Sequence, residues 1–178
     1  MTAHNTERDH IESTVKHCYS TWGSNYYDEY YGAKAPYPPV HTELLRKWLK
    51  NSGAHTLMDA GCGPASFLRD VTDLGMELYG FDLTPEMVAE GRRIFETRGL
   101  SPDRIWTGSI LDPRSFHPPA GGISHYDAVV CGGVLPHISA DDDTIVLRNI
   151  AAALNSGGVC AVEARNQLFA MFTMNRYS

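Results

Sequence analysis

The chain has 178 residues, of which 43% are hydrophobic, so it is long enough for one folded domain around a single core. Its formal net charge of −6 argues against a nucleic acid as the main partner, because phosphate binding requires a basic surface. A polar N-terminus and the lack of a long apolar run argue against a signal peptide and a membrane partner. The four separated cysteines predict reduced thiols in a cytoplasmic protein, and the eight histidines show no metal-ligand spacing, so no metal site is predicted.

The N-terminal segment is predicted to contain a helix followed by an aromatic stretch. Residues 1–8 are polar and expected to be loosely ordered, whereas apolar residues recur at helical spacing in residues 10–20. Residues 19–31 then combine one tryptophan with several tyrosines. Three prolines in residues 36–39 forbid a helix there and mark a connection to the next helix, predicted at residues 40–48.

Residues 56–67 predict a strand, a tight glycine turn and the start of a helix in direct succession. An apolar run ends at Asp59, and the turn passes through Gly61 and Gly63, whose lack of a side chain allows close approach of a ligand. The helix N-terminus behind the turn offers N–H groups to a polar ligand. Asp82 ends the next strand at about the ~20-residue spacing at which a carboxylate meets ribose hydroxyls. Together these features predict a nucleoside-binding α/β domain.

The rest of the chain alternates between strand and helix patterns. The almost unbroken apolar run at residues 126–131 is typical of a central parallel strand. This alternation predicts an α/β fold with a doubly wound, mainly parallel, Rossmann-like sheet. Beyond the glycine turn, strands are predicted at residues 77–82, 104–107, 126–131 and 159–163, and helices at residues 66–74, 85–98, 141–154 and 167–177.

The sequence Asp59-x-Gly61-x-Gly63 resembles motif I of the class I S-adenosylmethionine (SAM)-dependent methyltransferases, although Ala65 stands where that family often has a third glycine. The fingerprint of NAD-dependent dehydrogenases also follows a strand, but it needs glycine or alanine where this chain has Ser66. Asp59 also suits a cationic ligand better than a pyrophosphate, and SAM carries an ammonium and a sulfonium group. The methyltransferase interpretation is therefore preferred, and an NAD-dependent enzyme remains a less favoured alternative.

The resemblance implies a SAM site along the carboxyl ends of the strands. Asp59, Gly61 and Gly63 would hold the amino-acid end of SAM, and Asp82 would bind the ribose hydroxyls. The cofactor-binding residues implied in this way are Tyr19, Trp22, Tyr27, Asp59, Gly61, Cys62, Gly63, Asp82, Leu83, Met87, Ser109, Ile110, Leu111, Asp112, Cys131 and Gly132.

The resemblance also implies which residues contact the adenine and which segment covers the pocket. Residues 109–112 resemble motif III of the family, in which Asp112 would accept from the adenine amino group, but an ordinary Asp-Pro turn explains this residue equally well. Met87 would lie beside the adenine or simply pack in the core. Residues 19–31 look like the segment that covers the SAM pocket in small-molecule methyltransferases, where ring faces attract a sulfonium as they attract any cation.

The acceptor side is implied by residues after the predicted strand at 126–131, which resemble motif IV of the family. His137 could act as a general base near neutral pH or could hydrogen-bond structurally. Glu163 would face the acceptor pocket or form an ion pair with Arg165. Methyl transfer is a direct displacement, so positioning of the acceptor supplies much of the rate. The implied activity is methyl transfer from SAM to a small molecule, and a SAM-binding module without catalysis is the alternative.

The pattern accounts for five of the seven strands of a class I methyltransferase, whose order is 3-2-1-4-5-7-6. Residues 1–40 are expected to form a helical cap and lid, and residues 41–178 a SAM-binding core that lacks its C-terminal strands. The strand at 159–163 would then be an open edge, which favours unwanted pairing. A fragment of a longer enzyme is the preferred explanation, and a homodimer or a tail folded over the edge would also cover it.

Overall fold

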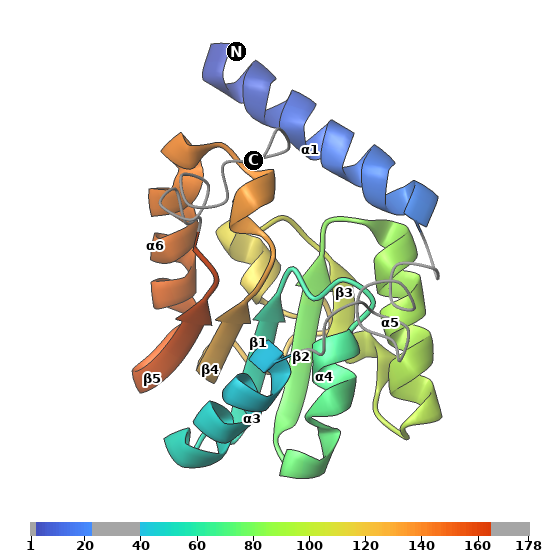
Figure 1. The fold of residues 1–178 in the computed structure, drawn as a ribbon, viewed down its shortest axis with the longest axis vertical. Helices are drawn as coiled ribbons and strands as arrows, with labels where there is room; N and C mark the ends of the chain where they lie inside the picture. Colours follow the sequence, from blue (N-terminus) through green and yellow to red (C-terminus); the bar gives the residue numbers. More distant parts are fainter. Residues whose placement is uncertain (1–2, 23–39, 165–178) are drawn as a thin grey trace.

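The structure, a computed structural model, describes residues 3–22 and 40–164. They form a parallel sheet in the order β3-β2-β1-β4-β5, which confirms the predicted fold class and the order of the five strands (Figure 1). No helix within the described residues is long and apolar enough to cross a membrane. The strands are β1 (Thr56–Ala60), β2 (Glu77–Asp82), β3 (Ile105–Thr107), β4 (Tyr126–Cys131) and β5 (Leu154–Val162).

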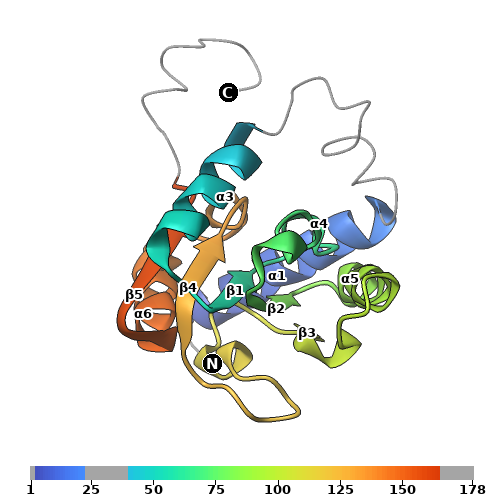
Figure 2. The same cartoon turned by 90° about the horizontal axis from the view of Figure 1, so that it is seen from below.

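Helices cover both faces of the sheet because side chains of successive strand residues point to opposite faces. Figure 2 shows α3 (Val40–Ser52) and α4 (Ser66–Asp70) on one face and α6 (Asp143–Ala153) on the other. Alternate strand residues belong to two hydrophobic clusters, one on each face of the sheet. Leu57 packs with α3, α4 and α5 (Pro85–Thr97), whereas Met58 packs with α6. Both strand residues are fully buried, so the two clusters together form the core of the domain.

Helix α1 (Ala3–Trp22) lies across the carboxyl ends of the strands (Figure 1). It begins at Ala3, so the expectation that residues 1–8 are loosely ordered is wrong for most of this segment. The physical reason is tertiary contact. Arg8 forms an ion pair with Asp142, and Glu12 accepts a hydrogen bond from Ser109. Composition alone does not reveal such partners.

The boundaries of two other elements differ from the prediction. Helix α4 ends at Asp70 and is followed by a 3₁₀ turn, instead of continuing to residue 74. Strand β5 starts at Leu154 and includes residues 155–158, which the sequence places between helix and strand. The pairing register shifts there, and Gly157 has a φ of +79°, so the extra residues form a bulge.

Strand β5 pairs only with β4 in the part of the chain that the structure describes. The predicted open edge is therefore present among these residues. The helix predicted at residues 167–177 lies outside the described residues, so its relation to this edge stays a prediction.

Candidate functional site

A cavity of about 660 Å³ opens at the carboxyl ends of β1, β2, β4 and β5. Its size lies within the ordinary range for small-molecule sites, and ligands of open α/β sheets bind at this edge. The structure brings eleven of the predicted site residues into its wall: Tyr19, Asp59, Gly61, Cys62, Gly63, Asp82, Met87, Cys131, Gly132, His137 and Glu163. The side chain of Trp22 and the whole of Tyr27 lie outside the described residues.

The glycine turn forms the floor of this cavity. The backbone N–H groups of Gly61 and Cys62 both donate to the carbonyl of Phe81, at 2.9 Å each, which fixes the turn against β2. Gly61 has a φ of +87°, and a Cβ there would lie 2.3 Å from Cγ2 of Val134. Ala65 has a φ of +58° and is fully buried, so alanine occupies the left-handed conformation for which the family often uses glycine.

Replacing Gly61 by alanine is expected to destabilise the fold by about 2–4 kcal/mol, because left-handed strain and overlap with Val134 add together. The matched control is Gly99→Ala, since Gly99 has a φ of +69° but nothing within 4 Å of an added Cβ. This control should lose only about 1–2 kcal/mol from strain. Urea denaturation of both variants measures the difference, and equal losses would show that Val134 moves aside without cost.

Asp82 is held rigidly at the end of β2. One carboxylate oxygen accepts from the N–H of Gly63 at 2.8 Å, and the other accepts from the N–H of Thr84 at 2.9 Å. Burial raises the pKa of this carboxyl, and the hydrogen bonds from Thr84 and Gly63 partly offset the increase. A carboxylate retains further lone pairs when it accepts two hydrogen bonds, so Asp82 can still accept from hydroxyl groups in the cavity.

Asp59 supplies a second carboxyl group to the same cavity. Its side chain is only 5% exposed, and burial, with a smaller contribution from Asp82, raises the pKa of Asp59 from 3.8 to about 7. Two acids beside a neutral glycine turn favour a ligand that brings positive charge to Asp59, because such a ligand offsets the cost of burying the ionised carboxylate.

Three side chains form the rim of the cavity. The hydroxyl of Tyr19 on α1 shares a hydrogen bond of 2.8 Å with Nε2 of His137, and the two rings meet edge to face at 5.4 Å. Desolvation by the surrounding protein lowers the pKa of His137, which keeps the imidazole neutral at pH 7. An oxygen of Glu163 accepts from the N–H of Gly133 at 2.8 Å. The partner considered for Glu163 from the sequence, Arg165, lies outside the described residues.

A family model described as a methyltransferase domain matches residues 58–160, which is more than half of the chain. The chain belongs to the methyltransferase-domain family. This membership agrees with the order of the strands and with the glycine turn between β1 and α4.

Known proteins that resemble this methyltransferase domain share its fold. A ubiquinone biosynthesis O-methyltransferase of Xanthomonas euvesicatoria is 29% identical over 136 residues, covering 76% of this chain and 53% of that protein. A SAM-dependent methyltransferase from Clostridium acetobutylicum superposes with a TM-score of 0.60 at 20% identity, covering 82% of this chain and 56% of that one. A SAM-bound amino pentose methyltransferase from Micromonospora echinaspora superposes with a TM-score of 0.57 at 21% identity, covering 71% of this chain and 50% of that one. The chain thus spans about half the length of the curated relatives it matches.

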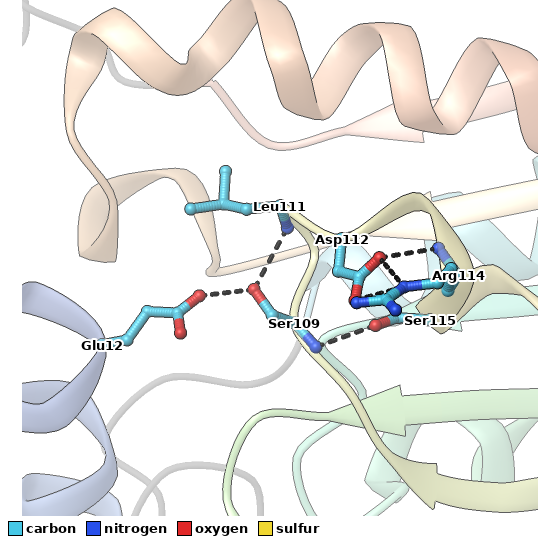
Figure 3. Close-up of polar contacts among 6 residues, drawn as sticks. All are labelled: Glu12, Ser109, Leu111, Asp112, Arg114 and Ser115. Carbon is cyan, nitrogen blue, oxygen red and sulfur yellow. Dashed lines mark hydrogen bonds and ion pairs between the residues drawn. The ribbon is translucent and has the colours of Figure 1, made fainter. Parts of the chain in front are cut away.

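None of the residues 109–112, which resemble motif III of the methyltransferases, is among the residues that line the cavity. Figure 3 shows the polar contacts that hold this segment. Ser109 Oγ donates to Glu12 of α1 and accepts from the N–H of Leu111. Asp112 accepts from the backbone N–H of Arg114 at 3.0 Å and from its guanidinium at 2.7 Å, and Arg114 lowers the pKa of Asp112. Ile110 is buried in the core. Leu83, which follows Asp82, is likewise absent from the described cavity wall.

Several residues line the cavity that the sequence did not indicate. Val15 on α1 and Leu44 and Leu45 on α3 reach the cavity only through tertiary packing. Thr84 follows Asp82 by two residues and could have been found from that position. Ser66, which in the sequence is only a mismatch to the dinucleotide fingerprint, also lines the cavity.

Proposed function

We propose that this methyltransferase domain binds SAM and transfers its methyl group to a small-molecule acceptor. The observation that carries the proposal is the arrangement of Asp59, the glycine turn and Asp82 around one cavity at the carboxyl ends of the strands. Bound SAM supplies an electrophilic methyl group on a sulfonium. The protein has to hold that group, orient the acceptor in line with it and exclude water.

The residues present fit the groups of SAM. The buried carboxylate of Asp59 suits the ammonium of the amino-acid end, and the space beside Gly63, where an added Cβ would meet nothing within 4 Å, is open to the ligand. The carboxylate of Asp82, fixed by two backbone N–H groups, suits the ribose hydroxyls. Met87 lines the cavity, which is compatible with a place beside the adenine, and the role of Asp112 at the adenine amino group stays a prediction.

The acceptor is proposed to enter at the rim, between His137 and Glu163. A neutral imidazole near pH 7 can accept a proton from a weakly acidic acceptor, and Tyr19 orients that ring through its hydrogen bond. Support for a small acceptor comes from the names of the relatives, which include ubiquinone biosynthesis and amino pentose methyltransferases, and from the net charge of −6.

The proposal is tested by calorimetric titration with SAM and S-adenosylhomocysteine. Asp82→Asn should weaken binding roughly ten- to a hundredfold, because the ribose loses hydrogen bonds to a charged acceptor. The matched control is Asp127→Asn. Asp127 also accepts from two backbone N–H groups, those of His55 and Thr56, but at the opposite ends of the strands. Equal losses of affinity in both variants would contradict the proposed role of Asp82, and a folded wild type that binds neither ligand would contradict the proposal.

The alternative is a module that binds SAM without catalysis. An acceptor panel of small phenols, amines and carboxylates, read out by formation of S-adenosylhomocysteine, separates the two functions. Tight binding with no turnover on the panel favours the module.

Three further assignments belong to this proposal. Residues 1–40 act as the cap and lid, as supported by the hydrogen bond between Tyr19 of α1 and His137 at the rim of the cavity, and residues 41–178 form the core. A second copy covers the open edge of β5, which analytical ultracentrifugation tests as a concentration-dependent dimer. The protein works in the cytoplasm, which fits four cysteines that form no disulfide in the described residues.

A further inference from the structure

Leu44 on α3 is a large apolar side chain that the fold leaves exposed. The three apolar residues that follow it on this helix, Leu45, Trp48 and Leu49, all pack in the hydrophobic cluster on their face of the sheet. Leu44 belongs to neither hydrophobic cluster of the described residues and is 64% exposed. It lines the cavity instead. A partner for this side chain is therefore to be sought inside the cavity.

Leu147 on α6 is the other large hydrophobic residue that is exposed in the described part of the chain, at 50%. It lies outside the described cavity wall. A single exposed leucine is ordinary on a protein surface and needs no explanation. Leu44 differs from Leu147 because other apolar side chains line the same cavity.

These apolar side chains come from four elements that are distant in the sequence. Val15 lies on α1, Leu45 on α3, Phe67 on α4 and Val162 on β5, and all four line the cavity with Leu44. Each of the four is only partly buried, so some apolar surface of each stays accessible. The fold thus assembles an apolar wall next to the carboxylates of the same cavity.

The chemistry of this wall indicates what binds against it. The amino-acid end, the ribose and the adenine of SAM are assigned above to other residues, so the wall on α1 and α3 is left for the acceptor. Apolar surfaces associate because both are removed from water. A sugar would instead bury hydroxyl groups against side chains that offer no hydrogen bonds, which weakens binding. An apolar acceptor therefore fits this wall better than a polar one.

We propose that the acceptor has an apolar body, an aromatic ring with an alkyl substituent, that packs on Leu44. Its hydroxyl or amino group then faces the rim formed by His137 and Glu163. This inference rests on the proposed function and specifies the class of acceptor for the same site. It makes Leu44 a residue that selects the acceptor without taking part in the chemistry.

The test uses phenol and 4-butylphenol, which share the hydroxyl group and differ by a four-carbon chain. Calorimetric titration of each into the protein saturated with S-adenosylhomocysteine measures affinity without turnover. The wild type should bind 4-butylphenol about tenfold or more tighter than phenol, because the alkyl chain is removed from water. Leu44→Ser should reduce this ratio about threefold or more.

Leu147→Ser is the matched control, since it changes a similarly exposed leucine that lies outside the described cavity wall. It should leave the ratio unchanged, and both variants should unfold within a few degrees of the wild type. Three results overturn the inference: a wild type that binds 4-butylphenol no better than phenol, a ratio that Leu44→Ser leaves unchanged, or an equal reduction by both variants.

The unfolding temperatures provide a further check. A much larger loss in Leu44→Ser than in Leu147→Ser would mean that another part of the chain or a second copy already covers Leu44, which also overturns the inference. All of these results leave the proposed function standing as long as the wild type binds S-adenosylhomocysteine. A folded wild type that binds neither SAM nor S-adenosylhomocysteine overturns both.

Discussion

Asp59→Asn is expected to stabilise the unliganded protein by up to about 4 kcal/mol at pH 8. The pKa of Asp59 is about 7 in the folded protein, against 3.8 for an ordinary aspartate. The folded state therefore binds this proton more tightly than the unfolded state, so stability falls as the pH rises from about 4 to about 7. A difference of about three pKa units corresponds to about 4 kcal/mol, of which about 3 kcal/mol appears between pH 5 and pH 8.

Urea denaturation of the wild type and of Asp59→Asn at pH 5 and pH 8 measures this effect. The difference in the free energy of unfolding between the two proteins separates the effect of Asp59 from that of the other titrating groups. Asp127→Asn serves as the control of opposite sign, because hydrogen bonds from Asn155 and His55 lower the pKa of Asp127 and its charged form stabilises the fold. A stability difference between wild type and Asp59→Asn that stays constant from pH 5 to pH 8 would contradict the assignment.

The same substitution should weaken SAM binding, because the amide cannot neutralise the ammonium of the ligand. Binding of SAM by the wild type should also strengthen as the pH rises through 7, since the carboxyl of Asp59 has to ionise to form this pair. Stability and affinity therefore change in opposite directions with pH, which is a pattern that a purely structural acid does not produce.

Arg8→Ala is expected to destabilise the protein by about 2–3 kcal/mol. The side chain of Asp142 is 1% exposed, so removing a cationic partner leaves a buried negative charge with less compensation. Because the side chain of Arg8 is 25% exposed, the loss of stability should be smaller than for a fully buried ion pair. Chemical denaturation gives the loss, and hydrogen exchange of the α1 amides should show faster opening of this helix.

Arg114→Ala is the matched control for that prediction. Arg114 pairs with Asp112 at 2.7 Å, but its side chain is 88% exposed, so the pair is expected to contribute less than about 1 kcal/mol. A similar loss in both variants would mean that burial of Asp142 does not decide the energy of the α1 contact.

The sheet could be predicted from the sequence because the residues that specify each strand lie next to one another in the chain. The buried strands are apolar runs, and the glycine turn and the acids at the strand ends occupy fixed positions relative to those runs. The part of the site made by Asp59, Gly61 and Asp82 was therefore predictable. The bulge in β5 was not, because residues 155–158 resemble an ordinary turn and their pairing depends on β4.

The rest of the site depends on contacts between distant segments. Val15, Leu44 and Leu45 carry no local signal that separates a cavity wall from a core face. The contact between Glu12 and Ser109 joins residues 97 positions apart, and no pattern in either segment indicates it. The raised pKa of Asp59 likewise follows from burial in the folded state.

The contacts of α1 are graded in strength along its length. At the N-terminal end, Arg8 and the buried Asp142 form a charged pair, and Arg8 is outside the described cavity wall. At the rim, Tyr19 and His137 share a hydrogen bond between neutral groups in an exposed position. Separating the rim contact costs less free energy than separating the charged one. The charged contact therefore anchors α1 more firmly at the end away from the cavity than the neutral contact does at the rim.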